Sequence, residues 1–282
     1  MWWIALWGVV STVGIVGAVA SVNSVRFGRR VADEAREMAA SAGSPPPPMW
    51  SRLATLPKPV QRYLTKAITR ESRPVRLVRL RHGGSFRPSL NGSWLPIRGE
   101  QHFSTDPPGF IWWGRIRMAP GLWIDARDRS VNGVGEMFVR AASTVTLAKS
   151  TGPELDQGAL LRLLGEMAWF PTAFLDERYV RWSAIDDRRA TATLQVNGRT
   201  VSGEFEFGAD DLPTTFTADR YRDVGGGKSV LTPFLGTVSD FRLVDGLLVP
   251  HRVVGAWIVE GKAIEYVDFK VEQLEYDSSE RQ

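Results

Sequence analysis

The sequence predicts a mainly β protein with a few helices (α+β), an antiparallel meander of about eleven or twelve strands behind one N-terminal membrane helix. Three observations predict this fold class. Apolar and polar residues alternate over most of the chain beyond residue 75, which is the period of a strand. A run without charged side chains, residues 2–25, precedes them. Dipeptides that favour hairpin turns separate the later segments, namely Asn197-Gly198, Asp245-Gly246 and Glu260-Gly261.

The first element expected is a transmembrane helix over residues 2–25. Twenty-four helical residues span about 36 Å, which exceeds a hydrocarbon core of about 30 Å. Trp2, Trp3 and Trp7 are placed where interfacial aromatic residues occur. A cleaved signal peptide is the alternative, but it would need a basic segment before the apolar run and a shorter run. We therefore expect a single-pass membrane protein that is anchored in the bilayer by residues 2–25.

Basic residues directly after the apolar run predict its orientation. Arg26, Arg29 and Arg30 follow it, and no basic side chain precedes it. The positive-inside rule then places the globular domain in the cytoplasm, with the exported side as the alternative. Between residues 50 and 100, eleven Lys or Arg outnumber two acidic residues, which fits an anionic membrane surface. Nucleic acid is not an expected partner, because no binding motif accompanies these basic residues.

Residues 26–48 are expected to join the anchor to the folded domain. Residues 31–40 predict a juxtamembrane helix, and residues 41–48, with four consecutive prolines, predict a stiff extended linker. The globular domain is then expected over residues 49–282. It begins with a helix over residues 56–68, whose apolar side chains recur at helical spacing.

The middle of the chain, residues 107–150, reads as three strands, each with one apolar and one charged face. The charged face is expected to be a solvated ladder of opposite charges formed by Arg115, Arg117, Asp125, Arg127, Glu136 and Arg140. The apolar face needs a cover or a ligand. Apolar residues at helical spacing over 155–167 predict a helix that covers it. Further strands are expected at 76–86, 97–104, 179–186, 190–196, 199–207, 214–222, 238–244, 247–259 and 263–274.

The sequence contains no complete motif for cofactor or metal chemistry. The GGGKS stretch at 225–229 is similar to the end of a phosphate-binding loop, but Arg222 stands where that motif needs its first glycine, so a hairpin loop is predicted. The chain has no cysteine, and its three histidines lack metal-ligand spacing. Neither a metal nor a cofactor is therefore expected.

Four residues are the best candidates for acid or base catalysis. Carboxylates beside apolar residues can have raised pKa values, and a nearby histidine could assist them. The candidates are Glu166, Asp125, Glu136 and His102. The simpler interpretation of the carboxylates is that they pair with the neighbouring arginines.

Several segments together resemble an uncharacterised bacterial family known only as a domain of unknown function: LPKPVQRYL, PPGFIWWGRI, IDARDRSVNGVGEM, TGPEL, LLGEMAWFPTAFL and RWSAID. The resemblance covers about residues 56–276. This family in turn looks like the lipoprotein-localisation (Lol-type) fold. That likeness implies an incomplete barrel of about eleven antiparallel strands over helices, with an apolar cavity for acyl chains. Two features depart from it, since those carriers are exported and this chain has no cysteine for lipid attachment.

The first functional hypothesis is a membrane-tethered protein that binds a lipid or another apolar ligand in its half-barrel. The side chains expected to contact the ligand are Phe110, Trp112, Ile116, Leu122, Ile124 and Trp169. One alternative is an enzyme acting on a membrane-associated substrate, with its carboxylates in one cleft. The other is a scaffold domain with a filled core. The lack of a catalytic motif weighs against the enzyme.

Overall fold

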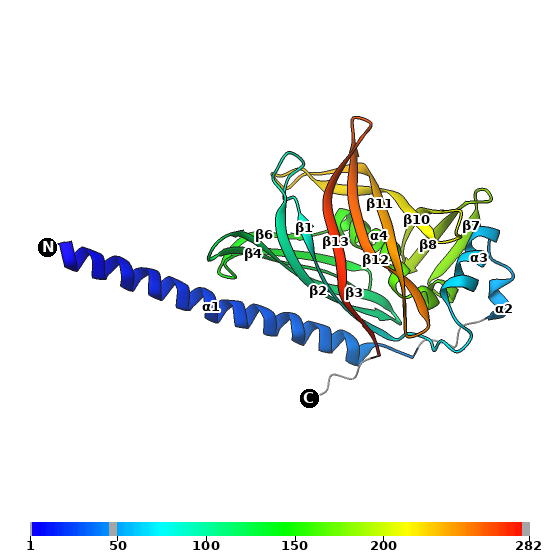
Figure 1. Cartoon of the computed structure of the whole chain (residues 1–282), viewed down its shortest axis with the longest axis horizontal. Coiled ribbons are helices and arrows are strands. Elements are labelled where there is room, and N and C mark those ends of the chain that lie inside the picture. The colour runs from blue at the N-terminus through cyan, green and yellow to red at the C-terminus, as the bar shows by residue number, and fades with distance from the viewer. Residues whose placement is uncertain (1, 45–49, 278–282) are drawn as a thin grey trace.

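The chain forms one open antiparallel sheet of thirteen strands. The computed structural model describes residues 2–44 and 50–277, without the side chains of residues 2–14 and 16. Two meanders, β1 to β6 and β7 to β13, join where β1 pairs with β13, and β6 and β7 are the two edges (Figure 1). The strands are β1 (Leu77–Phe86), β2 (Leu95–Thr105), β3 (Pro108–Ala119), β4 (Leu122–Val131), β5 (Val134–Ala141), β6 (Val145–Thr151), β7 (Val180–Ala184), β8 (Arg189–Val196), β9 (Arg199–Phe207), β10 (Pro213–Asp223), β11 (Ser229–Val244), β12 (Leu247–Val259) and β13 (Lys262–Tyr276).

The connection between the two meanders lies on the hollow side of the sheet. It forms helix α4 (Pro153–Glu166) and two short 3₁₀ helices, η1 (Met167–Trp169) and η2 (Pro171–Leu175). Helix α4 contacts β4 and β5 from one meander and β9 and β10 from the other, so the sheet curves around it (Figure 1). Leu160, Leu163 and Leu164 are fully buried in this packing. The covering helix predicted from the spacing over 155–167 is confirmed.

Helices α2 (Trp50–Leu53) and α3 (Lys58–Ala67) precede the sheet. Pro59 occupies the first turn of α3, where a missing backbone N–H costs nothing. Val60, Tyr63 and Leu64 are buried on one side of α3, which contacts β8, β12 and η2. The helix predicted over residues 56–68 is therefore confirmed.

The predicted number of about eleven strands is wrong because one turn carries no sequence signal. The segment expected as a single strand over 131–150 forms β5 and β6, which meet at Ala142 and Ser143. Both residues have positive φ, 46° and 55°, in a turn that Asn or Gly usually marks. The GGGKS hairpin is confirmed between β10 and β11, where the Val224 N–H donates to the Lys228 carbonyl at 3.0 Å.

The C-terminal half of helix α1 (Trp2–Ser41) packs along the outer face of the sheet (Figure 1). Its buried side chains recur every three or four residues and pack on Ile111 of β3; they are Phe27, Val31, Ala35 and Met38. Arg76 holds the end of the helix, since its guanidinium donates to the carbonyls of Ala39 and Ala42 at 2.8 and 2.9 Å. The helix expected over 31–40 is thus part of a longer one. Residues 45–48 of the predicted linker lie outside the described residues.

The charged ladder on the outer face forms two of the expected ion pairs, and its centre is not solvated, although Arg117 is exposed. Arg115 bonds Asp125 at 2.8 Å, and Arg127 bonds Glu136. Asp125 and Arg127 are fully buried because α1 lies across them and contributes Glu34, whose carboxylate is 3.4 Å from the Arg127 guanidinium. The expectation of a solvated surface fails because the apolar stripe of α1 needs a partner, and this face supplies it.

Within the described residues, no helix combines the length and the apolar character needed to span a membrane. The transmembrane anchor predicted over residues 2–25 is therefore not supported, nor is the single-pass placement that depends on it. Most side chains of that segment, those of residues 2–14 and 16, lie outside the described residues.

Ala35→Asp should detach α1 from the sheet. Ala35 is buried, so the substitution places a carboxylate in an apolar contact and is expected to cost about 2–4 kcal/mol. Hydrogen exchange over residues 26–41 should speed up in this variant. Ala32→Asp is the matched control, because Ala32 is exposed on the same helix. Equal protection in the two variants would contradict the observed packing.

Candidate functional site

A cavity of about 360 Å³ lies between helix α4 and the hollow face of the sheet. Eight strands contribute to its wall, β1, β3, β4 and β5 from one meander and β10 to β13 from the other, and α4 and η1 form its cover. Its volume falls within the range of single-ligand pockets, about 300–1,000 Å³. The cavity exists because the curved sheet is wider than α4, so the helix does not fill the space beneath it.

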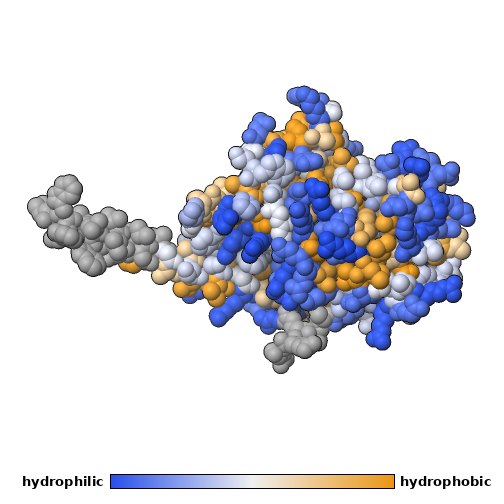
Figure 2. All heavy atoms as spheres, in the orientation of Figure 1, coloured by the Kyte–Doolittle hydropathy of each residue, from blue (hydrophilic) through white to orange (hydrophobic). Residues whose placement is uncertain are grey.

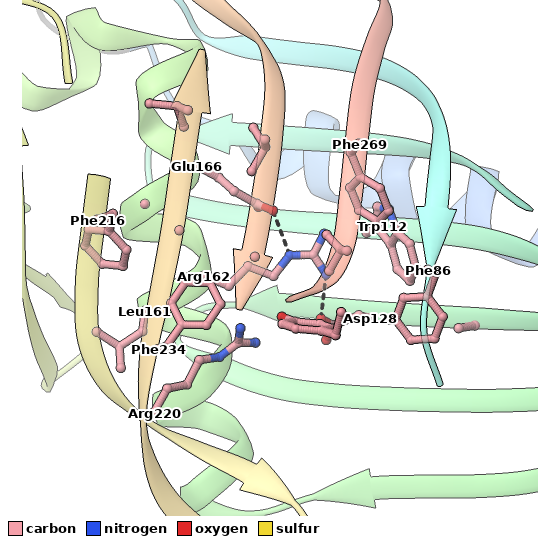
Figure 3. A pocket seen from close by; sticks show the side chains of 18 of the residues that line it. Phe86, Trp112, Asp128, Leu161, Arg162, Glu166, Phe216, Arg220, Phe234 and Phe269 are labelled. Carbon is pink, nitrogen blue, oxygen red and sulfur yellow. Dashed lines mark hydrogen bonds and ion pairs between the residues drawn. The ribbon is translucent and has the colours of Figure 1, made fainter. Parts of the chain in front are cut away.

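The lining is mostly apolar and rich in aromatic rings. Figure 3 shows several of these rings around the space, including Phe86, Phe216, Phe234 and Phe269. These residues lie on the inward-facing positions of their strands, whereas hydrophilic residues cover much of the outer surface (Figure 2). Apolar ligands are favoured in such a site because burying apolar surface is worth about 25 cal/mol per Å².

A buried ion-pair cluster crosses the cavity. Arg162 of α4 bonds Glu166 on the same helix and Asp128 of β4, both at 2.8 Å (Figure 3). The Gln101 side chain accepts from Arg162 at 3.0 Å and donates to Glu166 at 2.7 Å. Burial raises the pKa of Glu166, although Arg162 opposes this shift. The cluster ties α4 to the sheet, and its charges are largely satisfied within it.

His82 of β1 contacts two residues of the cavity wall, Trp112 and Phe269. Its ring accepts a hydrogen bond from Trp112 Nε1 at 2.9 Å and stacks on Phe269, with ring centroids 4.0 Å apart. Burial, and then the charge of Arg162, lowers the pKa of His82 to about 3. A neutral ring is required here, because a protonated His82 could not accept from Trp112.

The ring of His82 should therefore stay neutral in NMR titrations down to about pH 4.5. An ordinary histidine titrates near pH 6.5. Because the unfolded chain binds this proton and the native one does not, the free energy of unfolding should fall as the pH drops from about 6.5 toward 3, by up to about 1.4 kcal/mol per pH unit. His82→Gln identifies the resonance and should flatten this slope. A midpoint between pH 6 and 7 for the His82 ring would refute the assignment.

The structure brings four of the six predicted ligand-contacting residues to the cavity wall. Trp112, Ile116, Ile124 and Trp169 all line it. Phe110 is fully buried but lies beneath Arg162, whose guanidinium carbon is 4.9 Å from the ring centroid. Leu122 is 48% exposed at the start of β4. Contact of any of these side chains with a ligand stays a prediction.

The four candidate acid/base residues do not share a cleft. Glu166 faces the cavity. Asp125 and Glu136 lie on the opposite face of the sheet under α1, and Asp125 there accepts hydrogen bonds from Trp113, Trp123 and Ser143. His102 is also on that face, 3.0 Å from Glu100. The convergence that the enzyme hypothesis requires is therefore not seen. In the described part of the chain, no group of three or more potential metal ligands gathers.

Residues 48–269 match the model of a protein family whose description is "Family of unknown function (DUF6544)". The chain belongs to this family. The predicted resemblance to an uncharacterised family is thereby confirmed. No curated protein matches the DUF6544 chain.

Solved structures with a similar arrangement include two of the Lol type. A putative outer membrane lipoprotein-sorting protein domain from Vibrio parahaemolyticus has 7% identity and a TM-score of 0.35, covering 72% of this chain and 86% of its own. A LolA superfamily protein from Nitrosomonas europaea has 9% identity and a TM-score of 0.34, covering 74% and 89%. A beta-barrel-like protein of domain of unknown function DUF1849 from Brucella abortus has 10% identity and a TM-score of 0.30, covering 73% and 100%. At these TM-scores the likeness carries no inference about what the DUF6544 chain binds.

The sequence analysis did not identify several charged residues that line the DUF6544 cavity. Asp128 has the same strand parity as Ile124 and Ala126, which face the cavity. The sequence therefore could have predicted a charged side chain on the apolar face. Arg162 was missed as well: its i, i+4 spacing to the predicted candidate Glu166 fits an ion pair on α4 but does not reveal that the pair is buried. Arg220 alternates inward with Phe216 on β10, yet its place in the cavity depends on the curvature of the sheet.

Proposed function

We propose that this protein binds the acyl chain of a lipid, or a similar apolar ligand, in the cavity beneath α4. The observation that carries the proposal is the cavity itself, about 360 Å³ of space with a mainly apolar lining from both meanders. A scaffold with a filled core would lack such a space. The separation of the acid/base candidates onto two faces of the sheet favours binding over catalysis by those residues.

The energetics support an acyl chain as the ligand. Each methylene transferred from water into an apolar site contributes about 0.8 kcal/mol, so ten methylenes contribute about 8 kcal/mol. Lower estimates of the entropic cost of association are about 4 kcal/mol. A single chain can therefore bind through burial, and polar contacts are needed only for selectivity.

Mass spectrometry of an organic extract from the purified full-length chain tests the proposal. We expect one or a few lipid species at close to stoichiometric amounts, or uptake of one equivalent of an added fatty acid if the purified protein is empty. A folded protein whose extract is clean, and which takes up no added fatty acid, would contradict the proposed function.

A further inference from the structure

We propose that Arg220 binds the anionic headgroup, a carboxylate or phosphate, of a single-chain amphiphile whose tail occupies the cavity. This inference rests on the proposed function and deepens it, since it selects anionic ligands among apolar-chain compounds.

Arg220 and Arg162 are the two cations among the described residues that line the cavity, and their surroundings differ. Both carboxylates of the lining, Asp128 and Glu166, bond Arg162. Arg220 has no ion pair or hydrogen bond within the described part of the chain, and its Nε atom is buried without a partner. Burying a guanidinium N–H without an acceptor is costly, so a ligand that supplies one would be stabilised at this point.

Aromatic rings hold the Arg220 side chain. Its guanidinium carbon lies 5.4 Å from the Phe234 ring centroid and 5.7 Å from that of Trp257. Figure 3 shows the side chain extending from β10 into the cavity beside Phe234. Stacking on aromatic rings satisfies the faces of a guanidinium and leaves its N–H groups free to donate in its plane.

The backbone around Arg220 is tied to α4 on both sides. Gln157 donates to the Asp219 carbonyl at 2.7 Å and accepts from the Tyr221 N–H at 3.3 Å. Gly158 lies against the side chain, and a Cβ at that position would be 3.4 Å from Arg220 Nε. The strand is therefore fixed with residue 220 facing inward, between the helix and the cavity.

The arrangement fits one headgroup and one tail. A planar guanidinium can donate two parallel hydrogen bonds to a carboxylate or phosphate, and such charge-assisted bonds are about twice as strong as neutral ones. The cavity wall that includes Arg220 also contains apolar side chains that can contact the tail, among them Phe234, Val253, Trp112 and Ile116. An uncharged ligand would fill the same wall but leave Arg220 without a partner.

Calorimetric titration of the full chain with dodecanoate, dodecanol and dodecyl phosphate tests the inference. The native protein should bind the two anions roughly tenfold or more tighter than the alcohol. Arg220→Met should bring the three dissociation constants within about threefold of each other while leaving that of dodecanol unchanged. The tighter of the two anions identifies the headgroup.

Two further variants complete the test. Arg252→Met is the matched control, because Arg252 is exposed on β12, pairs with Asp268 and does not line the cavity, and this variant should keep the preference for anions. Arg220→Lys keeps the positive charge, so it should retain part of the preference for anions. This result would show that Arg220→Met loses the preference through loss of charge and not through misfolding of the site. An unchanged preference in Arg220→Met, or no preference in the native protein, would overturn the role of Arg220 and leave the proposed function standing. Failure of the native protein to bind any of the three ligands would refute the proposed function itself.

Discussion

Val253→Trp is expected to weaken the binding of dodecanoate by about tenfold or more, because the indole occupies space that the acyl chain needs. Val253 of β12 lines the cavity on the wall opposite α4. The larger side chain should enter existing free space, so the variant should stay folded and lose little stability. Calorimetric titration gives the dissociation constant, and circular dichroism checks the fold.

The neighbouring residue provides a matched control for this substitution. Val254 is the same residue type on the same strand, but it points to the other face and does not line the cavity. Val254→Trp should bind dodecanoate as the native protein does. Equal weakening by both substitutions would mean that the ligand does not occupy the cavity.

Arg162→Met is expected to lower the free energy of unfolding by about 3–5 kcal/mol, because it leaves Asp128 and Glu166 as buried carboxylates without their cation. Chemical denaturation at pH 7 measures this loss. In the variant the pKa of Glu166, which burial already raises, should rise further because Arg162 no longer opposes the shift. The folded state then binds more protons than the unfolded state, so the stability of the variant should rise as the pH falls toward 5.

The triple variant Arg162→Met, Asp128→Asn, Glu166→Gln isolates the charge effect. Removing all three charges together should restore most of the lost stability, because no uncompensated ion is left in the cavity wall. A loss below about 1 kcal/mol in Arg162→Met alone would show that the cluster is far more hydrated than its burial indicates.

Alternation predicted the sheet well, because most strands bury one face against α4 or the core, whereas β6 is largely exposed. Ile116 and Ile124 are paired partners in β3 and β4 and both reach the cavity, as their shared parity predicts. Leu122 has the same parity as Ile124, but it is the first residue of β4, at the hairpin end of the strand, where it is 48% exposed and does not line the cavity. Alternation assigns a side chain to a face of the sheet but not to a position along the strand, so it could not separate these two residues.

The rest of the site depends on contacts between distant segments. The outer charged face was expected to be solvated, but α1 covers it through an apolar stripe that a sequence pattern cannot assign to a particular partner. Arg162 and Arg220 come from segments almost sixty residues apart, and only the curved sheet places both at one cavity. Among the described residues, Arg162 has carboxylate partners at the cavity and Arg220 has none. This difference supports the inference about the headgroup, and it arises only in the folded chain.

Photo-cross-linking with a dodecanoic acid that carries a diazirine near its methyl end tests acyl-chain binding in the cavity most directly. After irradiation of the full chain, peptide mass spectrometry should locate the label on lining segments, within residues 112–126, 161–169 or 234–269, and excess unlabelled dodecanoate should abolish the labelling. Label confined to α1 or to outward-facing positions, or labelling that unlabelled dodecanoate does not reduce, would contradict acyl-chain binding in this cavity.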